Sequence, residues 1–182
     1  MPRLRVPTPD EMTGGQRFVY DATIAGRRGK APANVMVWLQ SPELASRAQF
    51  LGEFVRYDTT LTPRLSELAI LIVARHWTSQ YEWAVHSAEA AKAGVPVPVI
   101  EDIAARRRPK FTSQDELAVY DFSTALLATH AVPDGVYAAS VAALGERTTV
   151  ELVGVLGYYT LVAMTLSAFA VDPLVGGATL AP

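Results

Sequence analysis

The chain has 182 residues, of which 50% are hydrophobic and 19% are charged, and its formal net charge at pH 7 is −2. This length fits a single domain, and the composition disfavours both intrinsic disorder and a broad basic surface for nucleic acid. Cysteine is absent, which excludes disulfides, cysteine-ligated zinc and thiol redox chemistry and suits a reducing compartment. Residues 1–9 contain arginines but lack the apolar core of a signal peptide, so we expect a cytoplasmic location.

Helix signals dominate the chain, and each predicted helix has a capping residue, a proline or a glycine at one of its ends. The eight predicted helices cover residues 8–26, 41–55, 62–77, 79–93, 96–108, 113–130, 133–145 and 148–171. Loops are expected at 26–40, which contains the basic run 27–30, and at 56–62. No alternating strand pattern of useful length competes with these signals.

This pattern predicts the fold class. We expect an all-α, single-domain bundle of about eight helices over residues 1–182, with N-terminal helices in 1–60 and the core in 61–182. No internal repeat, low-complexity tract or linker divides the chain. Two helix starts carry a capping box, in which Ser or Thr is followed three residues later by Glu, namely Ser113 with Glu116 and Thr148 with Glu151.

The segment 152–171 contains no charged residue, and its 20 residues are enough to cross a bilayer by length alone. Its capping box, two glycines and scattered hydroxyl groups indicate a buried helix instead, and no basic residue follows it. A helix that is apolar on all sides must be covered on all sides. We therefore expect no membrane partner and a homo-oligomer in which such helices pack between subunits.

Four polar residues near the middle of the chain form the candidate site. Ser79, Glu82 and His86 fall at positions i, i+3 and i+7, which places them within about 60° on one helix face. Glu67 precedes the apolar run 68–74, so its carboxylate should lie near buried surface. Because burial without a partner is costly, we expect Glu67 to meet His86 or Ser79 and to hold the imidazole in one tautomer. This is a general acid/base arrangement.

Two other interpretations of these residues remain open. Glu67, Glu82 and His86 could bind a divalent metal, since two carboxylates and an imidazole suit zinc, iron or manganese. No second histidine lies at a ligand spacing, however, so we expect no metal and no cofactor. Glu82 and His86, four residues apart, could also be a simple surface pair.

Residues 65–71, 81–86 and 93–94 resemble the carboxymuconolactone decarboxylase family, part of the alkyl hydroperoxidase D-like superfamily. The resemblance extends over most of the chain and is strongest over 62–103. It implies the all-α fold of that superfamily and an assembly of identical subunits as a trimer or a hexamer, and a dimer is equally compatible with the composition.

In the peroxidase branch of the superfamily, a glutamate, a C-x-x-C pair and a histidine form the site. The glutamate and the histidine match Glu67 and His86, whereas the cysteine pair falls on Ser79 and Glu82. A hydroxyl and a carboxylate cannot attack a peroxide as a thiolate does and cannot form a disulfide. Peroxidase activity is therefore disfavoured.

The decarboxylase branch needs no thiol. The resemblance implies a cofactor-free lyase or isomerase that acts on a small carboxylated lactone or enolisable acid of aromatic catabolism. We expect His86 to donate the proton and Glu67 to orient it. Glu82 would share the proton relay or destabilise a departing carboxylate by its charge. The alternative is a non-catalytic relative that keeps the fold as a small-molecule-binding or assembly module.

Four further residues are predicted to contact the substrate, namely Ser79, Tyr81, Trp83 and Arg75. The first two would donate hydrogen bonds, the third would form an apolar wall, and the fourth would clamp a carboxylate. Arg56, Arg64 or an arginine from a neighbouring subunit could bind that carboxylate instead.

Overall fold

The computed structural model describes residues 3–174 and 176–182, and within them all regular structure is helical, as predicted. The elements in chain order are η1 (Pro9–Glu11, a 3-10 helix), α1 (Gly14–Ala25), α2 (Ala33–Trp38), α3 (Pro42–Tyr57), α4 (Pro63–His76), α5 (Gln80–Lys92), α6 (Val97–Ala104), α7 (Gln114–Thr129), α8 (Asp134–Leu144) and α9 (Glu146–Ala168).

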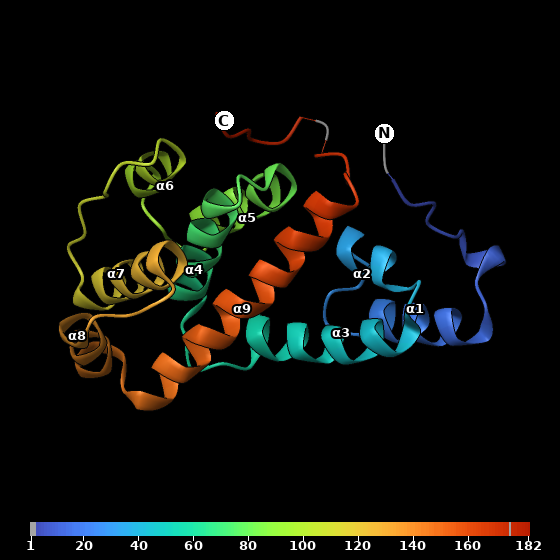
Figure 1. Ribbon diagram of the computed structural model, residues 1–182, viewed down its shortest axis with the longest axis horizontal. Coiled ribbons are helices and arrows are strands. Elements are labelled where there is room, and N and C mark those ends of the chain that lie inside the picture. Colours follow the sequence, from blue (N-terminus) through green and yellow to red (C-terminus); the bar gives the residue numbers. More distant parts are fainter. Residues whose placement is uncertain (1–2, 175) are drawn as a thin grey trace.

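Helix α4 is the centre of the fold. Every residue from 65 to 75 is buried, and the helix packs against α5, α7 and α9. The long helix α9 crosses the molecule diagonally beside α4 (Figure 1). Helices α1–α3 lie toward one end of the molecule and α7–α8 toward the other (Figure 1). The site described below lies where α3, α4, α5 and α9 meet.

A tight corner between α4 and α5 sets the geometry of the site. Thr62 caps α4 by accepting a hydrogen bond from the backbone N–H of Leu65, and Pro63 takes the first helical position. At the far end, Thr78 adopts a left-handed conformation (φ 49°), and the N–H of Ser79 donates to the carbonyl oxygen of Ala74 at 2.8 Å. This closure follows the usual pattern of a helix end and turns the chain directly into α5.

The N-terminal region differs from the prediction. The predicted helix 8–26 is divided, because Thr13 and Gln16 form a capping box that starts α1 anew. The predicted loop 26–40 contains α2, which buries Val35 and Trp38. Local sequence signals for α2 are weak, and its apolar side chains are stabilised by packing against α3 and α9.

The predicted capping box at Ser113 is wrong. The Ser113 hydroxyl donates to the carboxylate of Asp115 and does not cap α7. Glu116 is buried and accepts a hydrogen bond of 2.6 Å from Nε of Arg64. Glu116 therefore pairs with Arg64, which is distant in the sequence, and does not form a capping box with Ser113.

The second predicted capping box is wrong for the same kind of reason. Helix α9 begins at Glu146, after Gly145 in a left-handed conformation (φ 83°), so Thr148 already lies inside the helix. The side chains of Thr148 and Glu151 instead make hydrogen bonds to Thr60, which ties α9 to the loop after α3.

Helix α9 is long and apolar enough to cross a membrane by length and composition alone. In its most apolar window, 56% of the residues are buried inside the protein. Leu152, Val155 and Leu156 belong to the core, whereas Val150, which is 72% exposed, and Met164, which is 50% exposed, face outward. The helix is thus covered on its inner side and leaves an apolar outer face.

Candidate functional site

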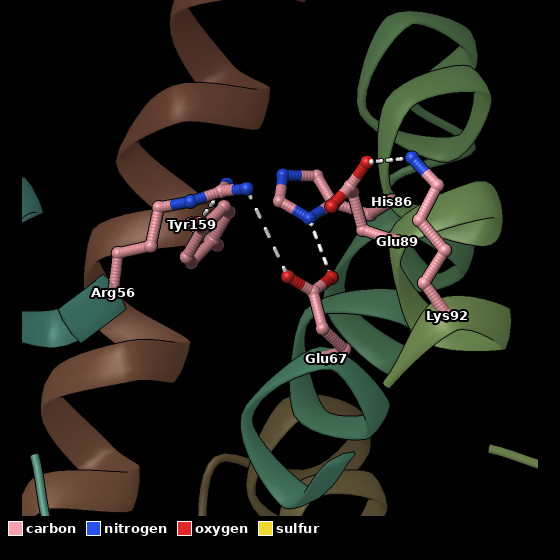
Figure 2. A network of polar contacts seen from close by, with 6 residues as sticks. All are labelled: Arg56, Glu67, His86, Glu89, Lys92 and Tyr159. Carbon is pink, nitrogen blue, oxygen red and sulfur yellow. Dashed lines mark hydrogen bonds and ion pairs between the residues drawn. The ribbon is translucent and has the colours of Figure 1, made fainter. Parts of the chain in front are cut away.

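Two neighbouring helices bring a histidine and a glutamate into contact. Glu67 belongs to α4 and His86 to α5, and both side chains are buried. Nδ1 of His86 lies 2.7 Å from Oε2 of Glu67 (Figure 2). Of the two partners expected for Glu67, His86 therefore makes the contact.

The contact assigns roles to the two ring nitrogens. An ionised carboxylate accepts hydrogen bonds but cannot donate them, so Nδ1 of His86 donates to Glu67. Nε2 is then the nitrogen that can exchange a proton with a ligand. In Figure 2 this nitrogen points away from Glu67, toward the guanidinium group of Arg56. The geometry is that of an oriented general acid/base.

Arg56 and Tyr159 complete the network around this pair. Nη2 of Arg56 lies 4.0 Å from Oε1 of Glu67, and its Nη1 donates to the Tyr159 hydroxyl at 3.5 Å. The Tyr159 ring stands edge-on to the His86 ring, with the ring centres 5.1 Å apart. Burial raises the pKa of Tyr159, so its hydroxyl stays protonated. Burial acts to lower the pKa of Arg56, but Tyr159 and Glu67 outweigh it and raise the pKa, which keeps the guanidinium charged.

A cavity of about 280 Å³ opens beside His86. Its wall carries three cations, Arg28, Lys30 and Arg56. The two carboxyl groups on the wall belong to Glu82 and Glu89, and Glu89 accepts a hydrogen bond of 2.8 Å from Lys92. The remaining polar and aromatic side chains in the wall are Asn34, Tyr57, Tyr81, Tyr158 and Tyr159. The cavity thus combines positive charge with aromatic surface.

Unpartnered polar atoms concentrate at this cavity. Among the residues that the structure describes, six buried side-chain nitrogen or oxygen atoms lack a hydrogen-bond partner. Four of them belong to cavity-lining residues: Nδ2 of Asn34, both carboxyl oxygens of Glu82, and the hydroxyl of Tyr158. Asn34 and Arg28 lie close enough to act on the Tyr158 hydroxyl, whereas both Glu82 oxygens keep no partner, which is unusual for buried polar groups.

Glu82 is neutral over most of the physiological pH range. It is 3% exposed, and burial raises the pKa of its carboxyl group to about 8. The Ser79 hydroxyl opposes this shift, although it forms no hydrogen bond of normal geometry with the carboxyl group. A neutral carboxylic acid can donate a hydrogen bond as well as accept one.

The Tyr158 hydroxyl reaches its position because residue 52 is a glycine. A Cβ atom on Gly52 would lie 2.1 Å from the hydroxyl oxygen of Tyr158 and 2.8 Å from Nη2 of Arg28. Helix α3 therefore leaves room for two cavity-lining side chains by omitting a side chain of its own.

The predicted substrate contacts fall into two groups. Tyr81 lines the cavity together with the predicted catalytic residues Glu82 and His86. Ser79, at the start of α5, and Trp83, which is 2% exposed in the core, are buried but do not line the cavity. Trp83 lies in the core because burial of its large apolar ring is favourable.

The structure also distinguishes the candidate arginines. Arg56 lines the cavity, whereas Arg64 pairs with Glu116 on α7. Arg75 lies elsewhere: its Nη1 donates to the carbonyl oxygen of Ala181 at 2.9 Å. Of the three, Arg56 alone reaches the surroundings of His86.

Several lining residues were missed by the sequence analysis. Arg28, Lys30 and Asn34 come from the segment predicted to be a loop, where the basic run 27–30 was the available signal. Tyr158 and Tyr159 come from the apolar helix α9, where adjacent tyrosines mark a polar interruption. Their convergence depends on long-range packing.

The arrangement of Glu67, Glu82 and His86 does not support the alternative of a metal site. Within residues 3–174 and 176–182, no group of three or more His, Asp or Glu side chains is arranged to hold a metal ion. Glu67 bonds to His86 on one side of the imidazole, while Glu82 keeps both oxygens unpartnered.

Comparisons with known proteins address the fold. No protein-family model and no curated protein matches the chain. An uncharacterized peroxidase-related protein from Silicibacter sp. TM1040 is similar in structure, with a TM-score of 0.75 and 13% identity over 96% of this chain and 92% of that chain. A peroxidase-related protein from Ralstonia eutropha JMP134, described as an alkylhydroperoxidase AhpD core, has a TM-score of 0.76 and 13% identity over 96% and 93%. The chain has the alkyl hydroperoxidase D-like fold.

Another neighbour with this AhpD-like fold is a debrominase. A cysteine-to-alanine variant of Bmp8 in complex with 2,3,4-tribromopyrrole has a TM-score of 0.74 and 13% identity, covering 96% of this chain and 91% of that chain. The predicted fold is thus confirmed, and proteins of this AhpD-like fold include an enzyme that binds a small ring compound.

Proposed function

We propose that this chain is a cofactor-free acid/base enzyme for a small carboxylated lactone or enolisable acid, and specifically a carbon–carbon lyase of the carboxymuconolactone decarboxylase type. The observation that carries the proposal is the His86–Glu67 pair beside a cavity with three cations and four unpartnered polar atoms. An oriented imidazole in a cavity with groups for binding an anion suits proton transfer to a bound acid.

Substrate binding would begin with charge. Arg28, Lys30 and Arg56 offer guanidinium and ammonium donors to a carboxylate or to a carbonyl oxygen. The tyrosine rings would pack against an unsaturated ring. Asn34, Glu82 and Tyr158 would supply the hydrogen bonds that they do not make within the protein.

Decarboxylation breaks the bond between the ring carbon and the departing carboxylate. The electron pair moves through the unsaturated system to the carbonyl oxygen of the substrate, and carbon dioxide leaves. Cationic and hydrogen-bonding groups stabilise the resulting enolate. Protonated His86 then delivers its Nε2 proton to carbon and later regains a proton from solvent, while Glu67 holds the ring through Nδ1.

Glu82 takes a different part from the one its sequence position suggested. Since its carboxyl group is neutral below about pH 8, it does not repel a departing carboxylate by charge. We propose that it donates a hydrogen bond to the enolate oxygen, a role that requires the proton.

The second candidate is a non-catalytic protein that binds a small molecule. Unpartnered polar atoms in the cavity favour a ligand, and they do not by themselves require turnover. Peroxide reduction is disfavoured by the absence of cysteine from the sequence.

The test measures carbon dioxide release and ultraviolet loss with a panel of carboxylated muconolactones, and calorimetric binding of the same compounds. We expect turnover by the wild type, none by His86→Ala, and kcat reduced about 10²-fold or more in Glu67→Gln, which disturbs the orientation of the ring. Circular dichroism verifies folding of both variants. Binding without turnover by any protein would favour the second candidate, and neither binding nor turnover would refute the proposal.

A further inference from the structure

A second cavity, of about 180 Å³, lies between α4, the end of α6 and α7. None of the residues that line it also lines the cavity beside His86. Ile72, Ile103 and Leu127 give it apolar walls, and Arg75 and Arg106 contribute positive charge. No step of the proposed reaction uses this cavity.

Arg75 is an unusual residue to find buried. It is 5% exposed, and it forms no ion pair with any residue in the described part of the chain. Nη1 donates to the carbonyl oxygen of Ala181 and, at 3.4 Å, to the hydroxyl of Thr78, but Nε has no partner. A buried cation without a counter-charge is costly, and an anion bound beside it would offset that cost.

Arg106 adds a second cation at the same place. Its Nη2 donates to the Thr78 hydroxyl at 3.1 Å, so Arg75 and Arg106 share one neutral acceptor. Burial lowers the pKa of Arg75, and the charge of Arg106 lowers it further. Burial and the charges of Arg106 and His130 likewise lower the pKa of His76, which also lines this cavity. The positive charge of Arg106 thus acts on both Arg75 and His76 at this cavity.

The neighbouring arginines behave differently. Arg107 pairs with Asp102 at 2.8 Å, and Arg108 pairs with Asp121 at 2.6 Å. Within the basic run 106–108, Arg106 alone has no carboxylate partner among the described residues. Its charge remains for a ligand.

We propose that this second cavity is a binding site for a small organic anion, a monocarboxylate with an apolar body. Arg106 and Arg75 would hold the carboxylate, because guanidinium groups bind carboxylates with paired hydrogen bonds. Ile72, Ile103 and Leu127 would pack against the apolar body, which favours an organic acid over a fully hydrated inorganic anion.

Benzoate is a suitable probe, and the histidines report where it binds. His76 lines the second cavity and His86 the first, so their imidazole proton signals in NMR spectra distinguish the two sites. We expect benzoate to shift the His76 signals, the neutral isostere benzamide to leave them unchanged, and inorganic phosphate to bind more weakly than benzoate.

Substitutions of two arginines from the basic run 106–108 then test the contact. Arg106→Gln should weaken benzoate binding about tenfold or more in calorimetry, because it removes an unpaired cation from the cavity. Arg108→Gln is the control for a cation of the same run: Arg108 lies over the ring of the lining residue Tyr120 but does not itself line the cavity, and its loss should leave the affinity within about twofold. Arg106 is exposed, so its replacement should not disturb folding.

Three results would overturn the site. The first is that benzoate does not bind the wild type. The second is that benzoate shifts only the His86 signals and binds with an affinity that depends on Arg56. The third is that Arg106→Gln and Arg108→Gln lose the same affinity for benzoate. Phosphate binding as tightly as benzoate would overturn the assignment to an apolar carboxylate.

Discussion

At the scale of single residues, Glu82 carries a stability cost that depends on pH. In the unfolded chain a glutamate releases its proton near its ordinary pKa of 4.5, whereas the folded protein holds the Glu82 proton up to about pH 8. Between these values the folded state binds more protons than the unfolded state, so the free energy of unfolding falls as pH rises. Below about pH 4.5 neutral Glu82 makes its full contribution to the free energy of unfolding, and above about pH 8 that contribution is lost.

Glu82→Gln tests this cost because it keeps the shape and removes the titration. We expect the variant to gain stability relative to the wild type as pH rises through this window, by a total on the order of several kcal/mol, measured by urea unfolding at a series of pH values. Glu101→Gln, at an exposed position on α6, is the control and should show no such trend. A constant difference between wild type and Glu82→Gln across the window would contradict the account.

At the scale of helices, the contact between α3 and α9 depends on Gly52. Alanine at this position would place Cβ 2.1 Å from the Tyr158 hydroxyl oxygen and 2.4 Å from its ring carbon Cζ. The packed side chains around Tyr158 would have to shift to relieve this overlap. We therefore expect Gly52→Ala to lower the free energy of unfolding by roughly 1–3 kcal/mol. Adding Tyr158→Phe should recover part of the loss by removing the hydroxyl.

Gly154→Ala provides the matched control in α9. Its Cβ would lie 3.8 Å from Cγ1 of Val55, an ordinary contact. The substitution should be neutral or should stabilise the helix by about 0.5–1 kcal/mol, because alanine favours helix more than glycine does. Equal losses in Gly52→Ala and Gly154→Ala, in urea unfolding or thermal melts, would show that the close approach at Gly52 is not the cause.

The same scale shows what the sequence could predict. Proline and glycine signals identified α3 to α6 and α8 because these signals act within a few residues. The capping boxes at Ser113 and Thr148 were wrong because Arg64 and Thr60, distant in sequence, bind the capping side chains or their partners. Helix α2 was missed because tertiary packing determines it.

The candidate site divides in the same way. The Glu67–His86 contact could be predicted because both residues lie on adjacent helices joined by a short corner, where helical phase fixes their directions. Asn34 and Tyr158 could not be placed, since their positions depend on how α2 and α9 pack around α3 and α5. Nothing in the local sequence indicated that Arg56 rather than Arg75 would reach His86.

At the scale of the whole molecule, the outer face of α9 exposes apolar side chains to solvent. Val150, Val153 and Met164 are 72%, 45% and 50% exposed along this face. We propose that a second copy of the chain covers it in a homo-oligomer, since single exposed apolar residues are ordinary but a continuous helix face is a site of association.

Light scattering coupled to size-exclusion chromatography tests this proposal. We expect the wild type to be an oligomer and the double variant Val153→Glu, Met164→Glu to shift toward monomer, because buried charges at an interface are costly. Val97→Glu, at an exposed site on α6, should leave the mass unchanged. A monomeric wild type would contradict the proposal.

The central claim is that His86, oriented by Glu67, delivers a proton to carbon in the cavity that Arg56 helps to line. The most direct measurement is turnover of the best muconolactone in heavy water, with product analysis by NMR and mass spectrometry. The account predicts deuterium at a carbon of the enolate that loss of carbon dioxide forms, either the carbon that lost it or the carbon next to the carbonyl group, and no product with His86→Ala. Turnover by His86→Ala at the wild-type rate, or product without deuterium at either of these carbons, would contradict it.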